Sequence, residues 1–399
     1  MSRLAIIAVL AFAPAAAAQT PPANPADNGR AYSAELLADA AGRSSAQAAA
    51  AFAVNVHGYT QFRYIWTHLD DDALEDDTAI GFQASRTRLL ISGNILSEQW
   101  SYLIQFGFDG IGGDTAPATL LDAYGAYRME SGWTVTLGQF RIPFLREELV
   151  TEPNQLAIER SPTNFAFNQG RSQAVQLGFG GGEGEALRFA GAFSDGFRAA
   201  NTDYISAAES DWALTARLEW KWAGDWRQFR DFTSFPNSDF AGMLGIAGHY
   251  QQGGDTANTA DADLWGATVD ASIEGNGWNL FAAAMALDTD PAGGESATDY
   301  GWLVQGGLFI APQAELFARY DMTLPDDDRT TLDDDFSTIT AGLNYYLLPE
   351  SHAAKLTGQV IYFLDSPSQS IAPTSTRIPL LASDEDGQWS ILGQVQLVF

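Results

Sequence analysis

The stretch GQWSILGQVQLVF (387–399) decides the fold class of this chain. From Trp389 to Phe399 every second position is mostly apolar, and the positions between them are mostly polar. A period of two residues is typical of an extended strand with one apolar face and one polar face. Because no polar residue follows Phe399, we expect this strand to be paired up to its last residue.

The composition narrows the possible functions. The chain has 399 residues with 50 acidic and 21 basic side chains, which gives a formal net charge of -29. Nucleic-acid binding requires a basic surface, so we expect no nucleic-acid partner. The 11 Trp, 13 Tyr and 24 Phe residues argue against a disordered chain. The absence of cysteine excludes disulfides and thiolate metal sites, and we expect no metal and no cofactor.

The first residues, MSRLAIIAVLAFAPAAAA (1–18), have the pattern of a secretory signal peptide. A basic residue precedes a short apolar run, and small residues follow it as a cleavage site. A membrane anchor is the alternative, but the apolar run is short for a spanning helix. Residues 19–53 are predicted to form a periplasmic linker with a short helix, and residues 54–399 form the folded part.

From residue 54 onward the two-residue period recurs. In WSYLIQFGFD (100–109) aromatic and aliphatic residues alternate with mostly polar or small ones. About sixteen segments follow this pattern: 54–66, 82–96, 100–109, 121–129, 133–140, 175–180, 187–193, 212–222, 243–250, 264–273, 278–287, 300–310, 314–322, 338–346, 355–363 and 388–399. Alternating segments of about ten residues are what a tilted membrane-spanning β-strand requires.

The connections between these segments alternate in length. Turns such as SEQ (97–99) and EGNG (274–277) are short, whereas loops such as residues 141–174 are long and polar. Short turns at one rim and long loops at the other are typical of outer-membrane barrels. Residues 223–242 break the rule, because a short turn is expected there. Either that turn carries an insertion, or the strand count is wrong at this point.

The pattern therefore predicts an all-β, transmembrane antiparallel β-barrel in the outer membrane of a Gram-negative bacterium. Trp and Tyr residues gather near segment ends, as in aromatic girdles at membrane interfaces. A soluble β-sandwich is the alternative, but it has no need of so many long strands. A barrel leaves no open edge in lipid, so the last strand must pair with the first. Phe399 is also predicted to be a signal for the outer-membrane assembly machinery, and lipopolysaccharide a partner.

The segment LGQFRIPFLREELVTEPNQLAIERS (137–161) carries a family resemblance. It is similar to the G-(K/Q)-F-(K/R)-x-P-F-x-x-E signature of the phosphate- and pyrophosphate-selective porin O/P family, and FQASRTRLLISGNI (82–95) resembles that family's Arg-rich second strand. The motif residues are Gly138, Phe140, Pro143, Phe144, Glu147 and Glu148. The resemblance implies a sixteen-strand, trimeric porin whose third extracellular loop, residues 141–174, folds into the lumen.

The resemblance also implies arginines that line the pore and bind anions. Guanidinium groups on a narrow wall attract anions and bind phosphate in a bidentate manner. The candidates are Arg63, Arg86, Arg88, Arg128, Arg141, Arg146, Arg160, Arg171, Arg188, Arg217 and Arg319. The alternative role of each is a structural ion pair with a carboxylate in the same lumen. The family's pore lysines are missing, because the chain has only Lys221 and Lys355.

An enzyme is not expected. The four histidines accompany no G-x-S-x-G or H-E-x-x-H motif, and the Gly-rich stretch 178–186 has no P-loop lysine. We predict an outer-membrane porin through which small hydrophilic solutes diffuse passively, including anions such as phosphate or polyphosphate. The alternative is a structural or binding barrel that its own loops plug and that conducts little.

Overall fold

The computed structural model describes residues 52–69, 77–109, 118–182, 184–255, 261–329 and 331–399. The predicted signal peptide (1–18) and residues 19–51 of the predicted N-terminal segment lie outside the described residues. No helix in the described part of the chain is long and apolar enough to cross a membrane.

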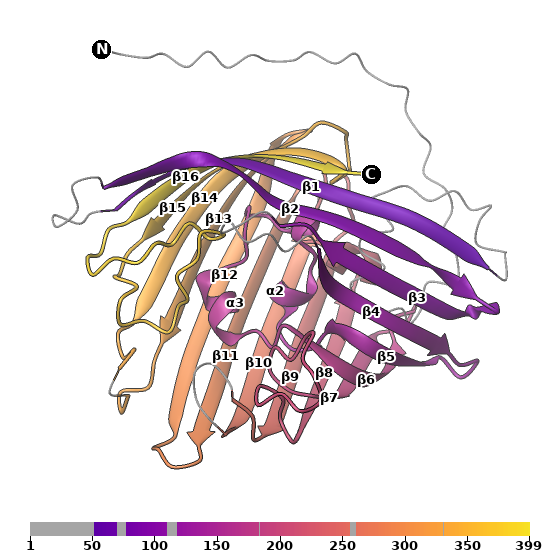
Figure 1. The fold of residues 1–399 in the computed structure, drawn as a ribbon. Helices are drawn as coiled ribbons and strands as arrows, with labels where there is room; N and C mark the ends of the chain where they lie inside the picture. Colours follow the sequence, from indigo (N-terminus) through magenta and orange to yellow (C-terminus); the bar gives the residue numbers. More distant parts are fainter. Residues whose placement is uncertain (1–51, 70–76, 110–117, 183, 256–260, 330) are drawn as a thin grey trace.

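Sixteen antiparallel strands form one closed barrel, each strand pairing with its neighbours in sequence (Figure 1). The strands are β1 (Ala53–His68), β2 (Thr78–Ile95), β3 (Ser97–Gly107), β4 (Thr119–Arg128), β5 (Trp133–Arg141), β6 (Arg171–Gly180), β7 (Leu187–Ser194), β8 (Trp212–Ala223), β9 (Ala241–Gln252), β10 (Ala262–Gly275), β11 (Trp278–Pro291), β12 (Ala297–Ala311), β13 (Ala314–Leu324), β14 (Phe336–Tyr346), β15 (Ala354–Phe363) and β16 (Trp389–Val398). Each predicted segment corresponds to one strand, so the predicted fold is confirmed.

The ring closes between β1 and β16, with Phe62 opposite Val395 in the register. The pairing continues to the end of the chain. The backbone N–H of Phe399 donates to Gly58 O at 2.8 Å, and Gly58 N–H donates to Phe399 O at 2.7 Å. A Cβ atom on Gly58 would lie 2.8 Å from both Arg88 O and the Phe399 ring. Glycine is therefore required where the last residue meets the first strand.

The strands turn apolar side chains outward and polar side chains inward. In β15, for example, Leu356, Val360 and Tyr362 are exposed on the outer face, whereas Lys355 and Thr357 are buried inside. A soluble protein distributes these residues in the opposite way. An apolar outer face around a polar interior is the pattern of a membrane-spanning barrel.

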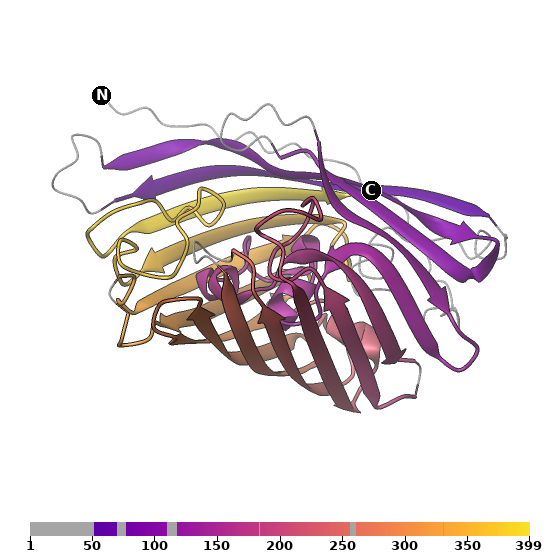
Figure 2. The same cartoon turned by 60° about the horizontal axis from the view of Figure 1, so that its bottom comes forward.

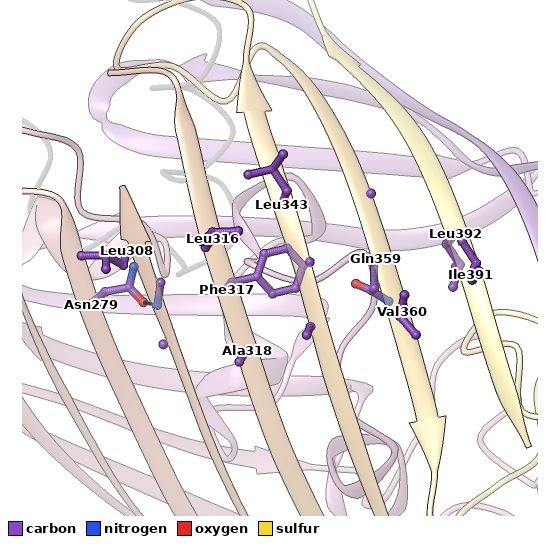
Figure 3. A pocket seen from close by; sticks show the side chains of 15 residues that line it. Asn279, Leu308, Leu316, Phe317, Ala318, Leu343, Gln359, Val360, Ile391 and Leu392 are labelled. Atoms are coloured by element: carbon purple, nitrogen blue, oxygen red, sulfur yellow. Dashed lines mark hydrogen bonds between the residues drawn. The ribbon is translucent and has the colours of Figure 1, made fainter. Parts of the chain in front are cut away.

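A depression of about 810 Å³ lies along β11–β16 (Figure 3). Outward-facing aliphatic side chains, among them Leu308, Leu343 and Val360, lie in its lining. Since this surface belongs to the apolar wall, the depression lies on the lipid-facing side. It is not a path for a polar solute, which must be sought inside the ring.

The two rims of the barrel differ. At one rim short turns join β4 to β5, β10 to β11 and β12 to β13, and at the other rim β5–β6, β7–β8 and β15–β16 have long connections. In outer-membrane barrels the short turns face the periplasm. Residues 224–240, between β8 and β9, are the exception at the short-turn rim, and they contain the 3₁₀ helix η3 (Trp226–Arg230). The strand count is correct, so this connection carries an insertion.

Candidate pore constriction

The connection between β5 and β6, residues 142–170, is named the lumen loop here. It contains the short helices α2 (Arg146–Leu149) and α3 (Pro162–Phe167) and the 3₁₀ helix η2 (Glu152–Asn154). Figures 1 and 2 show α2 and α3 between opposite walls of the barrel. The lumen loop begins soon after Gly138. The φ of Gly138 is +134°, which favours glycine, and a Cβ atom added to it would lie 2.1 Å from Ala123 O.

An apolar cluster fixes the loop to one wall. Buried loop residues contact buried residues that point inward from β10 to β13, where the strand pattern alone predicted polar side chains. The cluster includes Phe144, Val150, Leu156 and Phe167 of the loop and Leu264, Phe281, Leu303 and Phe317 of the wall. These inward apolar residues are shielded from water because the loop covers them. The loop therefore has its own small core.

Within the loop, α3 begins at a defined residue. Ser161 is its N-cap and accepts a hydrogen bond from Asn164 N at 2.9 Å, and Pro162 occupies the first turn. The Glu147 carboxylate accepts from Ser161 N at 2.8 Å and from Ser161 Oγ at 2.6 Å. Glu147, a motif residue, thus holds the start of α3 in place.

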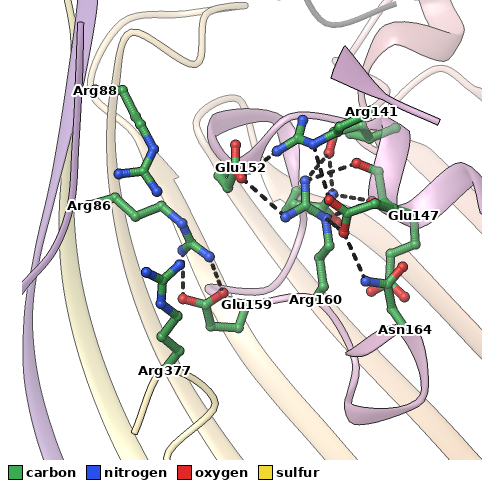
Figure 4. A network of polar contacts seen from close by, with 12 residues as sticks. Arg86, Arg88, Arg141, Glu147, Glu152, Glu159, Arg160, Asn164 and Arg377 are labelled. Atoms are coloured by element: carbon green, nitrogen blue, oxygen red, sulfur yellow. Dashed lines mark hydrogen bonds and ion pairs between the residues drawn. The ribbon is translucent and has the colours of Figure 1, made fainter. Parts of the chain in front are cut away.

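On the opposite side, Glu159 joins the loop to β1 and β2. Arg86 donates to the two oxygens of Glu159 at 2.6 and 2.7 Å (Figure 4). Arg63 forms an ion pair with the same carboxylate. All three side chains are buried. Burial alone would raise the pKa of Glu159, but the charges of Arg63 and Arg86 lower it to about 2. Glu159 is therefore ionised and fully neutralised by its partners.

A second group of charges lies near the beginning of the loop. Arg141 contacts Glu148 at 3.0 Å and Glu152 at 2.6 Å, and Arg160 contacts the same two carboxylates at 3.3 and 3.2 Å. Tyr59 of β1 donates its hydroxyl to Glu152 at 2.9 Å. Burial would raise the pKa values of Glu148 and Glu152, but the two arginines hold both below the usual range.

Most of the predicted arginines are paired with carboxylates. The pairs outside the two groups above are Arg88–Asp109, Arg171–Asp122, Arg188–Glu219, Arg217–Glu219, Arg217–Asp270, Arg319–Glu147 and Arg319–Asp321. Of the other two predicted arginines, Arg146 donates to Ser272 Oγ and Phe229 O, and Arg128 is half-buried at the end of β4. The structure thus brings the arginines together with acids, many of them on the lumen loop.

The two lysines lie apart from these groups. Lys355 is buried and donates to Pro153 O at 3.2 Å and to Gln155 O at 2.8 Å. Lys221 donates to Gly224 O at the short-turn rim. Lys355 therefore holds the lumen loop against β15.

Arg198 was not predicted as a site residue. It lies in the β7–β8 connection, its side chain is exposed, and it donates to Phe165 O and to Asn168 O of the lumen loop. No carboxylate of the described residues forms an ion pair with it. No motif surrounds Arg198 in the sequence, and its position depends on a contact between two loops.

These features define the class of protein. A closed barrel with an apolar outer face and a charged interior is the architecture of an outer-membrane porin. The family model of the phosphate-selective porin O and P family matches residues 56–361. The chain belongs to this family, and the protein is a channel of the Gram-negative outer membrane.

Solved structures share the fold at low sequence identity. An anion-selective porin from Comamonas acidovorans matches with a TM-score of 0.61 and 13% identity, over 87% of this chain and 100% of that chain. The outer membrane channel DcaP of Acinetobacter baumannii matches with a TM-score of 0.56 and 14% identity, over 89% and 99% of the two chains. OmpT of Vibrio cholerae matches with a TM-score of 0.57 and 11% identity, over 88% and 98%. Comparison with curated proteins gives no match.

Proposed function

We propose that this porin passes small hydrophilic solutes and prefers anions, including phosphate or polyphosphate. The lumen loop is the constriction, and the eleven predicted arginines set the electrostatic environment of the lumen. Passive diffusion needs no catalytic group, and we propose no enzymatic activity. The family to which the chain belongs is described as phosphate-selective, which supports an anionic solute.

The observation that carries the proposal is the neutralisation of the acids in the lumen loop. Glu147, Glu148, Glu152 and Glu159 each have an arginine partner within 3.4 Å. A paired carboxylate repels anions far less than a free one, because the partner's charge cancels its field at a distance. The overall charge of -29 therefore says little about the field at the constriction.

Arg198 provides an accessible positive charge beside the lumen loop. Its exposed guanidinium contacts the lumen loop and donates to two backbone carbonyls, and no carboxylate among the described residues forms an ion pair with it. An accessible guanidinium next to a narrow passage attracts anions and can bind phosphate through two N–H groups. The sign of selectivity follows from this imbalance between paired acids and an exposed base.

The test is a titration of phosphate into the chloride current of the purified protein in a planar bilayer. If phosphate binds in the lumen, the chloride current falls in a saturable way as phosphate rises. Sulfate at equal ionic strength is the control for screening. A chloride current that responds to neither anion beyond the change in ionic strength contradicts the proposal.

We also propose a course of maturation and assembly. Residues 1–18 are removed as a signal peptide, residues 19–53 remain as a periplasmic segment, and residues 54–399 form the barrel. Phe399 is recognised by the outer-membrane assembly machinery, and the mature protein is a homotrimer in contact with lipopolysaccharide. One solved structure with the same fold is described as a trimer form, which supports the trimer. Cross-linking of the purified protein tests it.

A further inference from the structure

Residues 224–240, between β8 and β9, are named the periplasmic insert here. We propose that the periplasmic insert is a second constriction of the pore. It enters from the short-turn rim, whereas the lumen loop enters from the opposite rim, and Arg146 joins the two segments. The proposal depends on the protein being a porin, but it does not depend on the proposed anion preference.

One part of the insert is fixed to β6–β8. Trp226 donates its indole N–H to Glu185 O, in the turn between β6 and β7, at 2.8 Å. The guanidinium of Arg188 on β7 lies 4.5 Å from the centre of the Trp226 ring. A capping box between Asp225 and Gln228 starts η3. The insert therefore leaves β8 as an ordered structure.

The next part of the insert contacts the opposite wall. Thr233 Oγ lies 3.0 Å from the hydroxyl of Tyr346 on β14. Asp231 pairs with His352, in the turn between β14 and β15, at 3.2 Å. In the ring of sixteen strands β7 and β14 are seven places apart, which is almost a full diameter. Between these two contacts the insert follows the inner wall, where Phe232 packs against Phe281 of β11 with ring centres 4.7 Å apart and Asn237 N–H donates to Asn276 Oδ1 in the β10–β11 turn. The insert therefore occupies the interior from β6–β8 to β14 near the short-turn rim.

The insert also contacts the lumen loop. Arg146 of α2 donates to Phe229 O at 2.8 Å, and its guanidinium lies 5.8 and 5.2 Å from the ring centres of Phe229 and Phe232. Phe232 N–H donates to Asn154 O at 3.2 Å. Cation–π contacts of this kind gain strength when they are removed from water, and Arg146 is buried. Arg146 therefore joins two segments that enter from opposite ends.

Buried contacts hold the insert in place, which distinguishes it from a mobile lid. Phe229, Phe232, Thr233 and Ser234 are all buried, and Phe229 forms an apolar cluster with Trp226, Ala241 and Met243 at the base of β8–β9. A segment with this many buried contacts stays in this position inside the barrel most of the time. A polypeptide that permanently occupies part of the lumen reduces the water-filled cross-section at that level, and so it limits both conductance and solute size.

The first test is a variant in which residues 225–239 are replaced by Asn-Gly, so that β8 and β9 are joined by a turn like Asn276–Gly277 between β10 and β11. We expect the single-channel conductance to rise by about two-fold and larger neutral polymers to enter. The reversal potential stays near that of the parent if the anion preference depends on the lumen loop. Thus a failure of this proposal is distinguishable from a failure of the proposed selectivity. A folded variant with the parent's conductance overturns it.

A second test does not require the deletion to fold. The chain has no cysteine, and Ser234 is buried with a hydroxyl that has no hydrogen-bond partner in the described residues. In the variant Ser234→Cys we expect a charged thiol reagent to react slowly. Adding Arg146→Met should speed the reaction by about tenfold, because the insert is released from the lumen loop.

The matched control is Arg227→Met, which removes an exposed arginine of the same insert that pairs with Asp225. It should leave both the thiol reaction and the conductance as in Ser234→Cys alone, whereas Arg146→Met should also raise the conductance. Equal reaction rates and equal conductance in the Arg146 and Arg227 variants would overturn the proposal. Heat-modifiable migration on gels confirms that each barrel has folded.

Discussion

Arg86 of β2 donates two hydrogen bonds to Glu159, at 2.6 and 2.7 Å, and this pair joins the lumen loop to the barrel wall. Arg63 of β1 completes the contact. The strand pattern identifies Arg86 as an inward residue. The pattern does not identify Glu159 of the loop as its partner. The position of the constriction depends on such loop-to-wall pairs.

Glu159→Gln should strongly destabilise the protein, because it leaves Arg63 and Arg86 buried without their counter-ion. Loss of one partner of a buried pair costs about 3–5 kcal/mol in the free energy of unfolding. Urea unfolding in lipid vesicles measures it. Glu295→Gln, at an exposed loop position, is the control and should change the free energy by less than about 0.5 kcal/mol. Equal effects of the two substitutions would show that Glu159 is not an anchor.

The contribution of Glu159 should depend on pH in a defined window. Its pKa is lowered from 4.5 to about 2 in the folded protein, so the folded state favours the ionised form. The stabilisation is fully present above pH 4.5 and is lost as the pH falls toward 2. The difference in unfolding free energy between the parent and Glu159→Gln should therefore shrink over this range. A difference that stays constant from pH 6 to pH 2 would contradict the assignment.

Arg198→Gln should reduce the preference for chloride over potassium, because it removes an exposed positive charge from the lumen loop. The reversal potential under a KCl gradient should shift toward zero, with little change in stability, since the side chain is exposed. Arg329→Gln is the control. It removes the same charge from the same rim, but Arg329 is paired with Asp299 at 2.5 Å. If the two variants give the same reversal potential, Arg198 is not a selectivity residue.

Phe399→Ala separates the two roles of the last residue. The backbone bonds between Phe399 and Gly58 do not need the aromatic ring, so the barrel should keep its stability once it has formed. If the ring is read during assembly, less of the variant should reach the outer membrane, as quantified in membrane fractions of cells. Normal accumulation of Phe399→Ala would mean that the ring carries no signal.

The barrel itself can be read from the sequence because the two-residue period is a local property. Trp389 to Phe399 and each of the other segments show it without reference to the rest of the chain. The motif Gly138–Glu148 likewise marks the loop, since Gly138 and Pro143 impose local backbone geometry. Strand number, closure and the boundaries of the lumen loop follow from such local signals.

The contents of the lumen depend on contacts between distant residues, and the sequence pattern does not specify them. Arg86 and Glu159 are far apart in the chain, so the pattern predicts a polar interior but not which charges cancel. Phe317 points inward because of its phase in β13, and contacts with the lumen loop shield its apolar ring from water. The insertion at 224–240 appeared in the sequence only as a departure from the turn rule, and Arg198 gave no signal at all.

The most direct test of the central claim is the reversal potential of the purified parent protein in a planar bilayer under a tenfold KCl gradient. We predict the sign that corresponds to preferential chloride flow, because the acids of the lumen loop are neutralised and Arg198 is exposed. A reversal potential of the opposite sign would show that negative charge controls the pore, and would contradict this account.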